Sequence, residues 1–82
     1  METLRGLVYR RIYSNTQNTY CVFVVRDYND EYITCTGRFE APKDGEDLEL
    51  KGRYVAHEIY GFQFYASSIE KLKPDNLGSA RL

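Results

Sequence analysis

Alternation of apolar and polar side chains divides the chain into five stretches of strand character. In the first stretch, residues 4–13, one face is predicted to carry Leu4, Gly6, Val8 and Ile12. The second, residues 20–25, is apolar at every position, which predicts a central strand covered on both sides or a strand with a bulge. The third, residues 32–36, alternates again and directs Ile33 and Cys35 inward.

The fourth and fifth stretches, residues 48–56 and 62–66, flank a predicted hairpin tip at residues 57–64. Gly61 is the residue there that adopts positive φ most readily, so residues 58–61 are predicted to form a four-residue loop. His57, the only histidine, lies at the entrance to this loop. Ile69 and Leu72 extend the fifth strand, which Pro74 ends.

The remaining connections are turns rather than helices. Residues 14–18 form a polar cluster and residues 27–30 supply a tight turn, so the second and third strands also form a hairpin. Between Gly37 and Leu48 the Pro42-Lys43-Asp44-Gly45 segment predicts a turn and leaves too little room for a helix of normal length.

These elements predict an all-β domain of the OB-fold type, a five-stranded Greek-key barrel with a short connection between its third and fourth strands. An SH3-like barrel is the alternative, although its strands are usually shorter and its first loop longer. We predict one domain at residues 1–73, followed by a linker or truncated tail at residues 74–82.

Composition and charge limit the functions that the chain could have. The 82 residues support a single small core, for which eight Tyr and four Phe supply bulky side chains. The net charge of −1 excludes a polycation, so nucleic-acid binding would need a local patch. Positive charge is concentrated in residues 1–26, which carry four arginines against one glutamate, whereas residues 27–50 carry eight carboxylates.

The two cysteines, Cys21 and Cys35, lack the spacing and the partner histidines of a zinc site. We predict two reduced, half-buried thiols, and the absence of a signal sequence favours a reducing cytoplasm. No apolar run approaches the roughly 20 residues that span a bilayer, so no membrane partner is expected.

Several motifs together resemble a known family. They are Leu4-x-Gly6-x-Val8, Ile12-Tyr13, Asn18-x-Tyr20-x-Val22, Leu50-x-Gly52 and His57-x-x-Tyr60-Gly61-x-Gln63-Phe64. In this order they resemble the N-terminal OB domain of the long, YrrC-type RecD/TraA-family DNA helicases, over residues 2–73. The last motif is the most specific. Thr19 departs from the pattern, because the family usually places Gly before the Tyr.

The resemblance implies a parent protein that hydrolyses ATP and unwinds DNA in repair and recombination. ATP and magnesium are expected for its helicase domains, into which the tail from Lys73 would lead. The chain itself contains no G-x-x-x-x-G-K-[ST] phosphate loop and is not expected to be an enzyme or to hold a cofactor.

No catalytic residue or metal ligand is assigned. His57 has no nucleophile or second acid close in sequence, so a structural role in the hairpin is predicted, shared with Tyr60, Gly61 and Gln63. The carboxylates at positions 44, 46, 47 and 49 lack the spacing of a calcium loop, and a solvated acidic turn is predicted there.

An OB-fold binds single strands on the face of its second and third strands, through stacking aromatics and cations. The candidate residues for such a contact are Arg10, Arg11, Tyr13, Asn15, Phe23, Arg26, Tyr32 and Tyr60. The first functional hypothesis is a weak single-stranded DNA contact that helps orient DNA in the parent helicase. The alternative is a docking module that packs on the helicase core or on a partner protein, because the barrel end left without a helix would expose apolar core.

Overall fold

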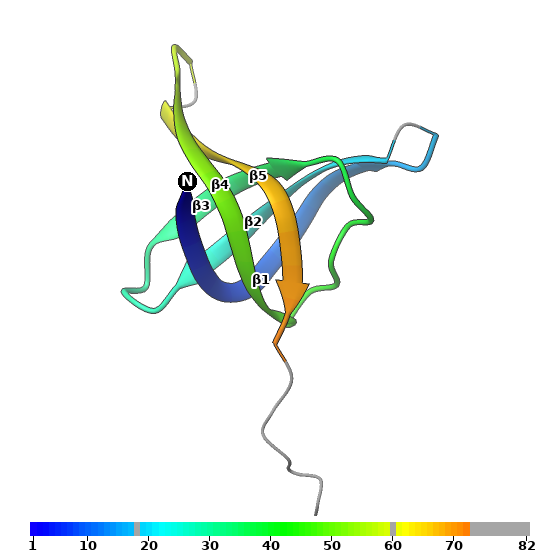
Figure 1. The fold of residues 1–82 in the computed structure, drawn as a ribbon, viewed down its shortest axis with the longest axis horizontal. Coiled ribbons are helices and arrows are strands. Elements are labelled where there is room, and N and C mark those ends of the chain that lie inside the picture. Colours follow the sequence, from blue (N-terminus) through cyan, green and yellow to red (C-terminus); the bar gives the residue numbers. More distant parts are fainter. Residues whose placement is uncertain (18, 60, 73–82) are drawn as a thin grey trace, which may run out of the picture.

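Five strands close into one barrel in the computed structural model, which describes residues 1–17, 19–59 and 61–72 (Figure 1). The strands are β1 (Glu2–Asn15), β2 (Tyr20–Asp27), β3 (Tyr32–Gly37), β4 (Asp47–His57) and β5 (Gly61–Lys71). Their order is β1-β2-β3-β5-β4, and β4 pairs with β1 to close the barrel. Only β3 and β5 are parallel neighbours. The predicted all-β barrel and its two hairpins are confirmed.

Strand β1 is long because it serves two neighbours. Residues 2–7 pair with β4 and residues 6–15 pair with β2. The β1–β2 register shifts twice, so that Tyr9 and Ile12 are extra residues without a partner in β2. A bulge reverses the alternation that follows it. The sequence-based placement of Ile12 on the inner face is therefore wrong, and its side chain is 53% exposed.

Strand β2 alternates regularly despite its apolar sequence. Cys21, Phe23 and Val25 are buried in the barrel, whereas Val22 and Val24 lie on the outer side and are half-buried. No further layer of secondary structure covers β2 among the described residues, and the bulges lie in β1 rather than in β2. The prediction of a strand covered on both sides is thus wrong, and the valines are partly covered by their neighbours in the sheet.

The connection between β3 and β4 closes one end of the barrel without a helix. Pro42 is fully buried, and Phe39 and Ala41 pack against the core. The ring of Phe39 lies 6.1 Å from that of Phe23. Backbone bonds from Gly45 to Val8 and from Val8 to Glu46 tie the connection to β1. The expectation that this end exposes apolar core is therefore wrong, since three side chains of the connection fill the space.

Two glycines have structural reasons to be glycine. Gly61 has φ of +76°, as predicted. It is the first residue of β5 and pairs with His57, so it belongs to the strand rather than to the predicted four-residue loop. Gly6 lies in a regular part of the ladder rather than at a bulge. A Cβ at this position would collide with the carbonyl group of Arg26, so Gly6 allows β1 to approach β2 closely where it also pairs with β4.

The turn between β1 and β2 contains a strained residue. Thr19 has φ of +56°, a left-handed conformation in which a β-branched side chain is disfavoured. At this same position the family that the sequence resembles usually has glycine. Asp30, in the turn between β2 and β3, has φ of +63°, but aspartate tolerates this conformation better.

Replacing Thr19 with glycine should stabilise the domain by about 1 kcal/mol, because glycine adopts positive φ without steric cost. The corresponding rise in melting temperature is about 4–8 °C for a domain of this size. Asp30→Gly is the matched control and should raise the melting temperature less. An equal or larger gain at Asp30, or a loss at Thr19, would contradict strain at Thr19.

The two cysteines are fully buried and unbonded to each other. Burial raises the pKa of the Cys35 thiol to about 12, and it also raises the pKa of Cys21, whose Sγ donates to the carbonyl of Phe39 at 3.4 Å. Because thiolate is the reactive form, both thiols are protected by burial and by protonation. The sequence had predicted thiols that were only half-buried.

In the folded chain, Ellman's reagent at about pH 8 should therefore react with neither cysteine faster than the domain opens. With a pKa of about 12, the thiolate fraction of Cys35 at that pH is on the order of one in ten thousand. Denaturant should release both thiols at once. Immediate reaction of the native protein would show that the core is open to solvent.

Candidate nucleic-acid interface

One outer surface of the barrel gathers tyrosines and arginines, and we call it the tyrosine face. It is formed by the outward side chains of β1, β2 and β3, whose alternation is opposite to that of buried Phe23. Partners in the register lie on the same side of a sheet, which assigns side chains from all three strands to this face. Its members include Tyr9, Arg10, Tyr13, Tyr20, Val22, Val24, Arg26, Tyr32 and Thr34.

Two pairs of tyrosine rings lie on this face. Tyr9 of β1 and Tyr32 of β3 meet across β2, with ring centres 4.8 Å apart and an interplanar angle of 81°. Tyr13 and Tyr20 lie 6.3 Å apart near the turn between β1 and β2. Three of the four rings are about half exposed. The edge-to-face contact of Tyr9 with Tyr32 and the tilted contact of Tyr13 with Tyr20 hold the rings in place while leaving ring surface accessible. Such rings can stack with bases.

Arginines accompany the rings. Arg10 pairs with Val24 and Arg26 pairs with Tyr32, so both side chains belong to the tyrosine face. Both are exposed, and neither forms an ion pair within the part of the chain that the structure describes. The guanidinium carbon of Arg38 lies 5.8 Å from the ring centre of Tyr20, a cation–π contact that places a third positive charge at the same edge.

Two of the predicted contact residues lie elsewhere. Phe23 is completely buried in the core, so it cannot stack on a base from outside the barrel. Arg11 pairs with Phe23 rather than with an outward residue of β2, because the bulge at Tyr9 shifts the register. Its backbone N–H donates to Oδ1 of Asp44 at 3.1 Å, and its side chain lines a cleft beside the connection between β3 and β4. Tyr60 lies outside the described residues.

Asn15 lies at the end of β1, beside the tyrosine face, and both halves of its amide are engaged. Its Oδ1 accepts a hydrogen bond from the backbone N–H of Gln17 at 2.9 Å, which forms the turn. Its Nδ2 donates to the hydroxyl of Tyr13 at 3.2 Å. Asn15 therefore orients both the turn and the Tyr13 ring, and its contact with DNA stays a prediction.

Tyr9, Tyr20 and Arg38 are residues that sequence reasoning did not select. Tyr9 projects onto the face only because it is the extra residue of a bulge, which no local pattern in the sequence predicts. Tyr20 and Arg38 become neighbours because the start of β2 lies beside the end of β3. Arg10, Tyr13, Arg26 and Tyr32 are the predicted residues that the structure does place on one face.

The tip of the β4–β5 hairpin has the local bonding of a structural turn. Nδ1 of His57 accepts a hydrogen bond from the backbone N–H of Ile59 at 3.2 Å. In a neutral ring that acceptor role assigns the proton to Nε2. Gln63 pairs with Val55 and projects on the same side of the hairpin as His57. The bond to Ile59 lies within the turn. The predicted hydrogen bond of His57 across the mouth of the hairpin stays a prediction, because Tyr60 lies outside the described residues.

The acidic residues between positions 44 and 49 each bind a different partner and do not form one cluster. Asp44 accepts from Arg11, Asp47 accepts from the hydroxyl of Tyr28, and Glu49 pairs with Arg5 at 3.3 Å. Glu46 accepts from the N–H of Lys43, which lowers its pKa, and it also pairs with Lys71. Over residues 1–17, 19–59 and 61–72 no three His, Cys, Asp or Glu side chains are grouped as metal ligands. The same residues include no helix long and apolar enough to cross a membrane.

Comparison with protein families identifies a match over nearly the whole chain. Residues 1–74 match the family model of the OB-fold domain of the ATP-dependent DNA helicase YrrC. The match includes all five strands of the barrel and ends within three residues of the end of β5.

Replacing His57 with alanine should lower stability by about 1 kcal/mol, because the N–H of Ile59 loses its acceptor in the turn. The melting temperature should fall by about 4–8 °C without loss of the fold. Glu58→Ala in the same turn is the control and should have little effect. An unchanged melting temperature for the histidine variant would rule out a structural role for His57.

Proposed function

Because the chain belongs to the family of OB-fold domains from YrrC-type ATP-dependent DNA helicases, we propose that its tyrosine face contacts single-stranded DNA and helps orient it in the parent enzyme. The observation that carries the proposal is the joint presence of two tyrosine pairs and three arginines on one side of the barrel. Stacking rings and backbone-tracking cations are the features that single-strand binding requires.

The arrangement of the rings supports a path across the strands. The Tyr9–Tyr32 pair and the Tyr13–Tyr20 pair lie toward opposite ends of β2, with Val24 and Val22 between them. Bases could stack at both pairs while Arg10 lies between them, next to Val24. Because rings contact every base through its π-face, such a contact would tolerate many sequences.

Charge limits the strength of this contact. Beyond Tyr32, the turn between β2 and β3 presents Asp27, Asp30 and Glu31, which would repel phosphates. The positive charge on the tyrosine face therefore comes from only three arginines, Arg10, Arg26 and Arg38, and acidic residues border the face at one end. We propose a weak, salt-sensitive contact that depends on the helicase domains for affinity.

The docking alternative needs a different location from the one that the sequence indicated. Its basis was an open barrel end beside the connection between β3 and β4, and Phe39, Ala41 and Pro42 fill that end. This observation favours the tyrosine face as the primary functional surface of the domain.

The experiment is fluorescence anisotropy of a labelled oligothymidylate of about 15 nucleotides, titrated with the 82-residue chain at low and moderate salt. Alanine at Tyr9 or Tyr13 should weaken binding by about 1–3 kcal/mol. Glutamine at Arg10 should reduce the salt dependence, since each phosphate contact contributes a slope of about −0.7 in log K against log salt.

Phe62→Ala and Arg53→Gln are the matched controls, because each changes an exposed residue of the β4–β5 hairpin away from the tyrosine face. They should leave the affinity unchanged. Absence of binding at low salt would rule out an autonomous DNA contact, and an equal loss in the hairpin controls would assign the contact to another surface.

A further inference from the structure

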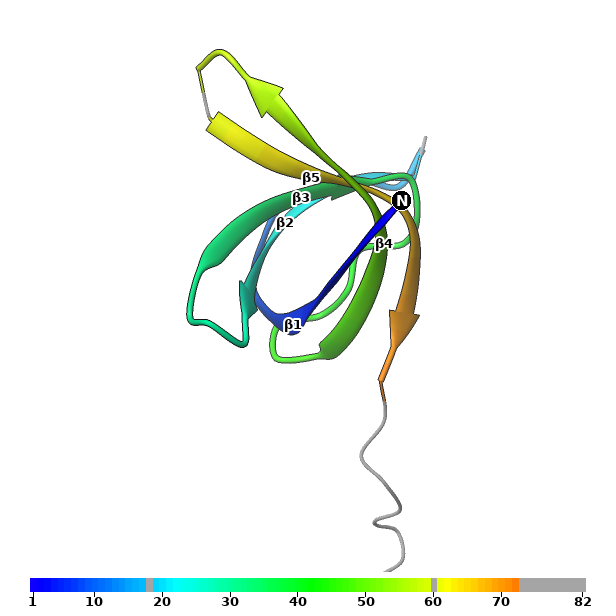
Figure 2. The same ribbon diagram turned by 60° about the vertical axis from the view of Figure 1, so that its left-hand side comes forward.

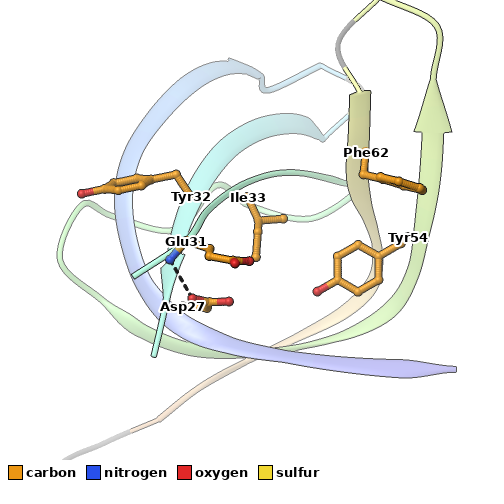
Figure 3. A pocket seen from close by; sticks show the side chains of 6 residues that line it. All are labelled: Asp27, Glu31, Tyr32, Ile33, Tyr54 and Phe62. Carbon is orange, nitrogen blue, oxygen red and sulfur yellow. Dashed lines mark hydrogen bonds between the residues drawn. The ribbon is translucent and has the colours of Figure 1, made fainter. Parts of the chain in front are cut away.

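The end of the barrel opposite the filled one has an open cleft, which we call the mouth (Figure 3). It has a volume of about 490 Å³ and is lined by Asp27, Glu31, Tyr32, Ile33, Tyr54 and Phe62. The first four residues come from β2, β3 and the turn between them, and the last two come from the β4–β5 hairpin. Figure 3 shows the hydroxyl of Tyr54 directed into the cleft, with Phe62 above it.

The mouth is open because the β4–β5 hairpin extends beyond the rest of the barrel (Figure 2). Pairing of β5 with β3 begins only at Phe64 and Cys35, and pairing of β4 with β1 ends at Gly52. Among the described residues, positions 32–34 of β3 and 61–63 of β5 therefore have unpaired edges toward each other. Unpaired edges of this kind accept an extended segment by backbone hydrogen bonding.

The hairpin side of the mouth exposes apolar surface. Phe62 pairs with Ala56 on the inner side of the hairpin, continuing the row of Phe64, and its side chain is 72% exposed. The ring of Tyr54 lies 5.0 Å from that of Phe64 and carries the aromatic surface outward from the core. Phe62, Tyr54 and Ile33 line the same cleft and supply the apolar part of its surface.

The other side of the mouth is acidic. Oδ1 of Asp27 accepts hydrogen bonds from the backbone N–H groups of Asn29 and Glu31, both at 2.9 Å. These bonds hold the carboxylate of Asp27 in place at the edge of the mouth. Glu31 is exposed and forms no ion pair with any described residue. The pKa of Tyr54 is raised, first by partial burial and then by the electrostatic influence of Glu2, Cys35, Asp27 and Glu31. Among the described residues that line the cleft, two are carboxylates and none is cationic.

We propose that the mouth is the docking site for a basic, extended segment of a protein partner. An arginine or lysine of that segment would lie between the rings of Tyr54 and Phe62 and the carboxylates of Asp27 and Glu31. Its apolar neighbours would cover Phe62 and Ile33. A nucleic acid does not fit this site, because its phosphates would face the two carboxylates.

The proposal is independent of the DNA contact, although the two surfaces meet at Tyr32. That ring lines the mouth and also packs on Tyr9 in the tyrosine face. Tyr32 is therefore unsuitable for separating the two functions. Phe62 lines the mouth and lies away from the tyrosine face, so it separates them best, whereas Glu31 lines the mouth and also belongs to the acidic boundary of the tyrosine face.

The test is a titration of the isotope-labelled chain, followed by amide chemical shifts, with a capped seven-residue peptide of alternating valine and arginine. Shifts should be concentrated at the mouth, around positions 27, 31–33, 54 and 62. The same peptide with citrulline in place of arginine should bind at least about threefold more weakly, since it lacks the charge.

Glu31→Gln should lower the affinity for the arginine peptide about threefold, because it removes a negative charge from the mouth. Phe62→Ala should lower it about tenfold, because it removes apolar contact surface. Glu40→Gln and Ile59→Ala are the matched controls, exposed residues outside the mouth, and should bind as the parent chain does. The amide spectrum of each variant verifies that it is folded.

Three results would overturn the proposal. They are equal binding of the citrulline peptide, shifts that map to the tyrosine face, and concentration-dependent dimerisation that protects the mouth from the peptide. The last would assign the mouth to a second copy of the chain. An oligothymidylate that shifts the mouth and leaves the tyrosine face unchanged would refute both this inference and the proposed DNA contact, whereas failure of the peptide alone leaves the DNA contact intact.

Discussion

The barrel depends on the double pairing of β1. One strand hydrogen-bonds to β4 through its first half and to β2 through the remainder, and without it the sheet would have two open edges. Gly6 lies at the crossover, where a side chain would collide with the backbone at Arg26. The two bulges farther along β1 accommodate the curvature that closure imposes. The tyrosine face is a consequence of this closure, since the bulges decide which β1 side chains project outward.

The two ends of the barrel differ in how their apolar surface is covered. At one end, the connection between β3 and β4 supplies Phe39, Ala41 and Pro42, which bury the ends of the core strands. At the other, the β4–β5 hairpin continues past its neighbours and leaves Phe62 exposed beside two carboxylates. The unfilled end is the one that remains available to a partner.

The acidic and basic side chains of the chain also differ in whether they have partners within the structure. The carboxylates of Asp44, Glu46, Asp47 and Glu49 are bound by backbone N–H groups, a tyrosine hydroxyl or cationic side chains. Arg10 and Arg26 have no such partners within the described residues and project from one face. A nearly neutral chain can therefore present a basic surface and an acidic one, with Tyr32 at the boundary between them.

The five strands, both hairpins, the positive φ of Gly61 and the helix-free connection before β4 were all predictable from the sequence, because periodicity and turn chemistry are local properties. Its family motifs also identified the domain. Pairing between distant strands places Arg11 off the predicted face, Tyr9 on it and Phe23 in the core, and it makes the mouth the open end of the barrel. The physical reason is that bulges, barrel closure and the relative lengths of neighbouring strands depend on pairing between distant segments, which no local pattern encodes.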